Sequence, residues 1–206
     1  MARKLRIGTR GSKLALAQTD LVRSKLINSY DSLTFEEIEI VVVRTTGDRI
    51  TDRTLADIGG KGLFVKELEE ALINGYVDLA VHSMKDMETK VSKDLIVPSI
   101  LVREDPRDVL ISAIADEIFQ LPQKAVVGTS SQRRGAQLRL LRPDLEIIML
   151  RGNIDTRLGK LERGEVEAIF LARAGLVRLG LTERVTATID PSYMLPAAGQ
   201  GAIGVQ

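Results

Sequence analysis

The segment Gly128-Thr129-Ser130-Ser131-Gln132-Arg133-Arg134 carries the clearest chemical pattern in the chain. The apolar run 125–127 before it predicts a short buried strand, and Leu138 and Leu141 after it are spaced for one face of a helix that Arg142-Pro143 ends. Hydroxyl and guanidinium groups therefore lie where a strand turns into a helix. Backbone N–H groups point outward at a helix start, and the helix dipole favours negative charge there. Because arginine presents a planar fork that suits carboxylate or phosphate, this turn is predicted to hold an anion.

The same alternation of strands and helices extends in both directions from this turn. Helices are predicted after Ser12, across 64–72 with Gly75 ending the helix, and across 156–163. The β-branched run 38–43 is typical of a strand covered on both faces. Further strands are predicted at 5–8, 79–81, 146–150 and 168–171, and from 202 onward. This alternation indicates α/β layers, whose ligands bind beyond the carboxyl ends of the strands.

Composition excludes several classes of function. The 206 residues suffice for one large domain or two smaller ones, and the net charge of +1 with 3% aromatic residues argues against a nucleic-acid partner. The chain has no cysteine and one histidine, His82, so neither disulfides nor a zinc site is expected. There is no apolar signal core and no run near the roughly 20 apolar residues of a membrane helix. We therefore expect a soluble, cytoplasmic protein without a membrane partner.

Polar and cationic residues recur after the predicted strands. Any one of them is more often a solvated surface charge than a ligand contact, but their repetition at successive strand ends favours a shared site. They indicate a compact ligand with several negative groups, held between two domains. In chain order they are Arg10, Ser12, Lys61, Ser83, Lys85, Asp86, Thr129, Ser131, Arg133, Arg134, Arg151, Arg157, Arg173 and Arg178.

Three of the motifs leave alternatives open. Gly59-Gly60-Lys61-Gly62 lacks the spacing of a nucleotide-binding P-loop. His82 ends a strand and is interpreted as a hydrogen-bonded structural histidine. Asp86 should remain ionised, since nearby positive charge favours the carboxylate, and its spacing fits a salt bridge and a catalytic role equally.

Together and in this order, the motifs resemble those of the porphobilinogen deaminase (hydroxymethylbilane synthase) family. The resemblance covers nearly the whole chain. It rests on the segments 6–12, 59–64, 81–86, 103–108, 127–134, 151–153 and 195–204.

The resemblance implies a cytoplasmic transferase of tetrapyrrole, porphyrin and haem biosynthesis. The family condenses four porphobilinogen molecules head to tail into hydroxymethylbilane and releases ammonia. Each pyrrole carries an acetate and a propionate, which would account for the cations. Asp86 would be the catalytic carboxylate, stabilising the methylene-pyrrole cation left when ammonia departs.

The resemblance also implies which residues bind the ligands, and it implies no metal. A dipyrromethane cofactor would be bound by Lys61, Ser83, Lys85, Thr129, Ser131, Arg133, Arg134 and Arg151. The substrate carboxylates would be bound by Arg10, Ser12, Arg157 and Arg178.

The expected fold is two α/β domains resembling the periplasmic binding protein type II fold, with the ligand in the cleft between them. Residues 1–99 plus 195–206 would form domain 1 and residues 100–194 domain 2, in a monomer. The sequence departs from the family at Asp57, where lysine is frequent, and at Glu88, where proline is frequent.

The largest departure concerns a third, C-terminal domain, whose cysteine in the family attaches the cofactor through a thioether. This chain has no cysteine and stops at Gln206. We therefore expect a truncated form that by itself neither anchors the cofactor covalently nor turns over substrate.

Two other functions compete with this prediction. A non-catalytic anion-binding protein of the same architecture would give Asp86 no clear purpose among the cations. A nucleic-acid-binding regulator is opposed by the near-zero net charge and the low aromatic content.

Overall fold

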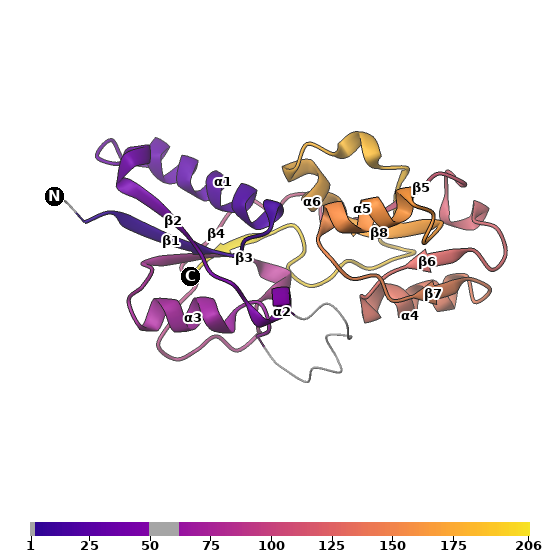
Figure 1. The fold of residues 1–206 in the computed structure, drawn as a ribbon, viewed down its shortest axis with the longest axis horizontal. Coiled ribbons are helices and arrows are strands. Elements are labelled where there is room, and N and C mark those ends of the chain that lie inside the picture. Colours follow the sequence, from indigo (N-terminus) through magenta and orange to yellow (C-terminus); the bar gives the residue numbers. More distant parts are fainter. Residues whose placement is uncertain (1–2, 50–61) are drawn as a thin grey trace. The chain divides into compact units, whose positions relative to one another are not determined.

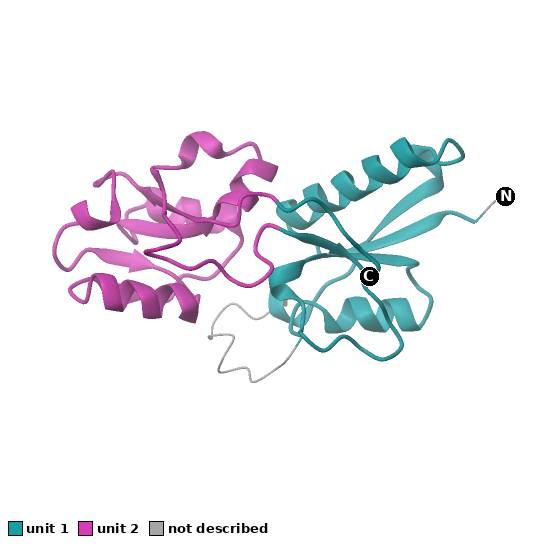
Figure 2. Ribbon diagram, turned by 180° about the vertical axis from the view of Figure 1, so that it is seen from behind, with its two compact units in different colours: residues 1–50, 59–103, 202–206 teal, residues 51–58, 104–201 magenta. Residues whose placement is uncertain are grey.

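The computed structural model describes residues 3–49 and 62–206. They divide into two compact units, the first made of residues 3–49, 62–103 and 202–206 and the second of residues 104–201 (Figure 2). The sequence predicts crossings at 99–100 and 194–195, whereas the chain crosses at 103–104 and 201–202. The physical reason is hydrogen bonding, because β4 (Ser99–Ile100) pairs within the first unit and Gln200 bonds to Asp108 within the second.

The first unit is a five-stranded sheet with helices on both faces. Its strands β1 (Leu5–Thr9), β2 (Ile38–Val42), β3 (Leu79–Ser83), β4 and β10 (Ile203–Val205) lie in the order β2-β1-β3-β10-β4. Strand β1 is parallel to β2 and β3, and β10 is antiparallel to β3 and β4. Helices α1 (Lys13–Ser29) and α3 (Lys66–Ile73) cover opposite faces of this sheet (Figure 1), and the short α2 (Thr46–Arg49) follows β2.

Successive side chains of the strands point to opposite faces of the sheet, so apolar side chains form a core on each face. Ile7 and Val81 pack with Val22 of α1 on one side. On the other side Leu68 of α3 approaches Gly8 so closely that an added Cβ would lie 3.2 Å from its Cδ2 atom. The prediction that β2 is covered on both faces is wrong, since Val42 is 52% exposed; β2 is one of the two edge strands of this sheet, so its side chains have a neighbouring strand on one side alone.

The second unit repeats the three-layer arrangement. Its strands β5 (Asp108–Ser112), β6 (Val126–Gly128), β7 (Glu146–Ile148), β8 (Ala168–Ala172) and β9 (Ala187–Thr188) lie in the order β7-β6-β8-β5-β9. Strand β6 is parallel to β7 and β8, and β5 is antiparallel to β8 and β9. Helix α4 (Gln132–Leu141) covers one face, while α5 (Ile154–Glu162) and α6 (Arg173–Arg178) cover the other (Figure 1).

The predicted strand–turn–helix around residue 128 is confirmed. Leu138 of α4 is fully buried against Phe170 of β8, as its helical spacing predicts. Gly128 ends β6 where space is scarce, because a Cβ there would lie 2.8 Å from Cδ2 of Leu150. The end of β6 therefore packs directly against the Leu150 side chain, and this close packing fixes where the turn begins.

The single histidine belongs to the core of the first unit. His82 lies on β3, pairs with Gly204 of β10 and is 5% exposed. Burial lowers the pKa of His82 from 6.5 to about 4, although a hydrogen bond with Gln206 opposes the shift. The imidazole is therefore neutral at pH 7, in agreement with a structural role.

This buried imidazole should make the fold sensitive to mild acid. The unfolded chain binds a proton near pH 6.5 and the folded chain only near pH 4, so the free energy of unfolding should fall as pH drops through that interval. The loss should reach about 3 kcal/mol at its lower end. Urea unfolding of the wild-type chain across this interval measures it. The His82→Gln variant should show a flatter dependence, and equal slopes for both proteins would contradict the assignment.

Candidate functional site

The predicted site residues gather at the carboxyl ends of the parallel strands in each unit. Arg10 follows β1 and Asp86 follows β3 in the first unit. In the second unit the turn 129–134 follows β6, and Arg173 follows β8. Within each sheet these ends lie at one edge, which is where α/β sheets bind ligands.

Arg10 is the organising cation of the first unit. Its Nη2 atom pairs with Oδ1 of Asp48, its Nε lies 3.2 Å from Oδ2 of Asp48, and its Nη1 lies 3.9 Å from Oδ2 of Asp86. The guanidinium carbon lies 4.0 Å from the centre of the Phe64 ring, a cation–π distance. Stacking and the two carboxylates fix the plane of this guanidinium, so Asp86 faces a positioned positive charge.

Asp48 was not among the predicted site residues. Burial alone would raise the pKa of Asp48, but hydrogen bonds from Arg10 and Thr45 outweigh it and hold the pKa below its usual value. Asp48 therefore stays ionised at neutral pH and can hold Arg10. Asp86 lies in the 3₁₀ turn Met84–Asp86 directly after β3, with 29% of its side chain exposed, so it remains accessible to a ligand.

The remaining predictions in the first unit have different surroundings. Ser83 exchanges hydrogen bonds with the buried Gln18 amide, whose Nε2 lies 2.9 Å from the serine Oγ. Ser12 caps α1, its Oγ accepting from the Ala15 N–H at 3.2 Å. Lys85 is exposed. Lys61 and the departure at Asp57 lie outside the described residues.

In the second unit, side chains shape the 129–134 turn from within. Ser131 caps α4 by accepting from the Arg134 N–H at 3.4 Å, and the Thr129 hydroxyl accepts from the Ser131 N–H at 3.2 Å. The Ser130 hydroxyl donates to the Leu150 carbonyl at 2.7 Å. The hydroxyl-rich sequence thus builds the start of the helix, and with it the anion-favouring end of α4.

The two arginines of the turn share one buried carboxylate. Asp108, at the start of β5, accepts a hydrogen bond from Nη2 of Arg134 at 2.7 Å on Oδ1, and its Oδ2 forms an ion pair with Nη2 of Arg133 at 2.7 Å that lacks hydrogen-bond geometry. Burial would raise the pKa of Asp108, but the charge and hydrogen bonds of Arg134, the Gln200 amide and Arg133 together lower it. Asp108 is therefore ionised, and it is a site residue that the sequence analysis missed. It lies in the segment 103–108, one of those that carry the family resemblance, but its place in the sequence does not show which cations it meets.

The other predicted site cations of the second unit are partly or fully buried. Arg151 is 9% exposed, and Arg157 donates from Nε to the Gly152 carbonyl at 2.8 Å. Arg178 donates to the Gly201 carbonyl at 2.5 Å, and burial lowers the pKa of its guanidinium although Glu104 opposes the shift. A half-desolvated cation of this kind gains by pairing with a ligand carboxylate. Arg173 is engaged by Asp105, with its Nε 3.1 Å from Oδ2.

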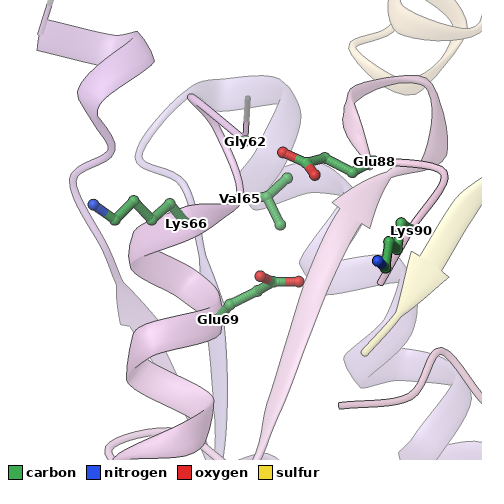
Figure 3. A pocket seen from close by; sticks show the side chains of 6 residues that line it. All are labelled: Gly62, Val65, Lys66, Glu69, Glu88 and Lys90. Carbon is green, nitrogen blue, oxygen red and sulfur yellow. The ribbon is translucent and has the colours of Figure 1, made fainter. Parts of the chain in front are cut away.

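A cavity of about 130 Å³ opens beside α3 in the first unit, and none of these residues lines it. The carboxylates of Glu69 and Glu88 turn into it, whereas Lys66 points away (Figure 3). Its lining of mixed charge does not suit a polyanion. It is lined by Gly62, Val65, Lys66, Glu69, Glu88 and Lys90.

Neither a metal cluster nor a membrane-spanning helix is present in the described part of the chain. Among residues 3–49 and 62–206, no cluster of three His, Cys, Asp or Glu side chains is arranged to hold a metal ion. Within the same ranges, no helix combines the length and apolar character needed to cross a membrane.

Comparison with known sequences identifies close relatives. Residues 5–206 match the family described as porphobilinogen deaminase, dipyromethane cofactor binding domain. The chain is 53% identical over 206 residues to the porphobilinogen deaminase of Desulforudis audaxviator, covering 100% of this chain and 66% of the relative. It is also 53% identical over 204 residues to that of Syntrophobacter fumaroxidans, covering 99% of this chain and 65% of the relative. The chain thus spans about two thirds of the length of these relatives.

Solved structures confirm the predicted architecture. A putative methionine-binding lipoprotein of Bacillus subtilis superposes with a TM-score of 0.53 at 11% identity, covering 98% of this chain and 82% of that one. A periplasmic substrate-binding protein of an ABC transporter from Coxiella burnetii gives a TM-score of 0.52 at 16% identity, covering 98% and 83%. At such low identity the likeness shows the fold alone, two α/β domains of the periplasmic binding protein kind.

The capping serines allow structural and ligand-binding roles to be separated. Replacing Ser12 or Ser131 by alanine should each lower the free energy of unfolding by about 1 kcal/mol, because each removes a helix cap. The matched control is Ser24→Ala at an exposed position inside α1, which should change stability by less than about 0.5 kcal/mol. Chemical denaturation measures all three variants. Unchanged stability in Ser12→Ala would mean that its hydroxyl is free to serve a ligand instead.

Proposed function

The chain belongs to the porphobilinogen deaminase family, and from this premise we propose that it provides the catalytic and cofactor-binding part of hydroxymethylbilane synthesis. The reaction joins four porphobilinogen molecules head to tail and releases ammonia at each step. The observation that carries the proposal is Asp86, a partly exposed carboxylate 3.9 Å from the fixed guanidinium of Arg10 at a strand end. A pathway that forms a cation on each substrate needs such a carboxylate.

The cations of the second unit fit the carboxylates of a dipyrromethane. Arg133 is 24% exposed and Arg178 is half-desolvated with a backbone carbonyl as acceptor, so both gain from a carboxylate partner. A bound dipyrromethane would supply the pyrrole end from which the chain of rings grows. Arg133 and Arg151 of the second unit, with Lys61, Ser83 and Lys85 of the first, would hold it, while Thr129, Ser131 and Arg134 would shape the turn that meets it. None of the 206 residues is a cysteine, so these residues themselves would supply hydrogen bonds and ion pairs to the group and no covalent bond.

Asp86 would act on the substrate itself. Its carboxylate accepts a hydrogen bond from the pyrrole N–H of porphobilinogen and stabilises the positive charge that develops as ammonia leaves. Arg10 keeps this carboxylate in place through the 3.9 Å contact and is itself held by Asp48. Arg10, Ser12, Arg157 and Arg178 would bind the acetate and propionate groups, which positions the methylene carbon for attack.

Several finer statements remain predictions from the sequence. These are the cleft that brings Asp86 and the arginines to one ligand, the monomeric state, the cytoplasmic location, and the lack of nucleic-acid or membrane partners. The competing function, as in the sequence analysis, is anion binding without catalysis. The position of Asp86 beside Arg10 supports the enzyme, because a receptor for anions gains nothing from a carboxylate there.

The first experiment tests the chain as it is. Calorimetric titration should show that the 206-residue chain binds porphobilinogen, while incubation with porphobilinogen should yield no hydroxymethylbilane. Binding is expected because the cations are built into the described units. Robust turnover by this chain would contradict the expected need for a covalent cofactor anchor.

The second experiment separates enzyme from receptor. In a form extended to the full length of the family, Asp86→Asn should lower kcat by at least roughly 100-fold and leave the KM for porphobilinogen within about threefold, since charge stabilisation is lost and carboxylate binding is kept. The matched control is Asp94→Asn, the same change at an exposed position of the same unit. Equal rates for both variants would favour the binding protein.

A further inference from the structure

We propose that Asp108 is a positioning residue of the anion-binding turn, which makes Arg134 an internal anchor and Arg133 the cation that meets a ligand carboxylate. This division of labour rests on the proposed function, which supplies the ligand. The carboxylate lies at the first position of β5, beside the end of β8, and so reaches the turn after β6 from the same edge of the sheet.

The burial of the three side chains sets their roles. Asp108 is fully buried, 6% of the Arg134 side chain is exposed, and 24% of Arg133 is exposed. Arg134 also donates from Nη1 to the Phe170 carbonyl at 2.8 Å, which turns its guanidinium toward the sheet. Arg133 is therefore the member of the pair that a ligand can reach.

The charges explain why the carboxylate is needed. Two adjacent guanidiniums at a helix start repel each other and the positive end of the helix dipole. One Asp108 carboxylate between them leaves one positive charge in excess, which lies on the exposed side with Arg133. The turn therefore presents a fixed single charge in place of two mobile ones.

Two neighbours fix the geometry further. Gln200, 1% exposed, donates from Nε2 to Asp108 Oδ1 at 2.9 Å and to the Pro106 carbonyl at 2.6 Å. Arg133 also donates from Nη1 to the Leu195 carbonyl, and the N–H of Leu195 donates to Gln137 at 2.7 Å. The ligand-facing guanidinium is thus held from two sides, by Asp108 and by the backbone at Leu195.

A role in positioning and a role in charge alone predict opposite results. If Asp108 only reduced the positive charge, its neutralisation would strengthen the binding of an anion. If it positions Arg133, neutralisation weakens binding even though the local charge becomes more positive.

The test is calorimetric titration of the 206-residue chain with porphobilinogen, the probe chosen because its acetate and propionate are the groups that a dipyrromethane would present to Arg133. Asp108→Asn should bind about tenfold more weakly than wild type, because an asparagine holds Arg133 without an ionic contact. The control, Asp144→Asn, removes the partner of Arg142 in the same unit and should leave the affinity unchanged. Unchanged or tighter binding by Asp108→Asn would overturn the proposal.

A double-mutant cycle excludes a merely structural effect. Arg133→Gln should weaken binding by about tenfold, and adding Asp108→Asn to it should change the affinity by less than about twofold, because the carboxylate acts through Arg133. Independent, additive losses would show that Asp108 only maintains the fold.

Two further measurements decide the remaining outcomes. If Asp108→Asn does not fold, Gln200→Met keeps the carboxylate but removes its donor, and should weaken binding about threefold in a manner coupled to Arg133. If the wild-type chain does not bind porphobilinogen, the proposed function fails, and the arginine Nε–Hε NMR signals still test positioning. The Arg133 signal should report an ordered side chain in wild type and Asp144→Asn and a mobile one in Asp108→Asn; equal mobility in all three overturns the proposal.

Discussion

The buried ion pair between Asp108 and Arg134 is the interaction on which the second unit depends. It joins the start of β5 to the start of α4, and Arg134 extends the link to the backbone of β8. Gln200, 92 residues further along the chain than Asp108, closes the network. A carboxylate buried away from solvent is costly unless cations lie beside it, and Arg134 and Arg133 both do, so these segments must meet in one arrangement. A buried ionic contact of this kind contributes specificity of arrangement more than net stability.

The first unit uses the opposite combination of charges. There one guanidinium, Arg10, lies between the carboxylates of Asp48 and Asp86, which leaves one negative charge in excess. In the second unit one carboxylate lies between two guanidiniums, which leaves one positive charge. The proposed chemistry requires both, since the substrate carries fixed negative carboxylates and becomes transiently positive at its reacting carbon. Each unit thus holds its excess charge still with a partner of the opposite sign.

The sequence predicts local structure better than it predicts partners. The strand, turn and helix around Gly128 follow from apolar spacing and a proline stop, and the structure has them where expected. Asp108 and Asp48 were missed because their role depends on the sheet order, which brings β5 beside β8 and the loop after β2 toward Arg10. In the sequence Arg134 has no visible partner, and an arginine of that kind is usually exposed. In the structure it is buried, because the fold places the Asp108 carboxylate beside it and so offsets the cost of removing its charge from water. Contacts between residues that are distant in the sequence are thus the feature of the site that residue spacing does not predict.

Strand β10 has a consequence for the order in which the chain folds. It lies between β3 and β4, so β3 and β4 are joined into one sheet only when residues 203–205 pair with both of them. The described residues of the second unit, by contrast, run without interruption from 104 to 201. During synthesis the amino-terminal domain of a protein is usually the first to fold. Here the first unit begins first but completes its sheet last, after residues 104–201 of the second unit have emerged. Strand β10 must then pair with β3, from which the whole of residues 104–201 separates it in sequence, and contacts between residues so distant in the chain form slowly.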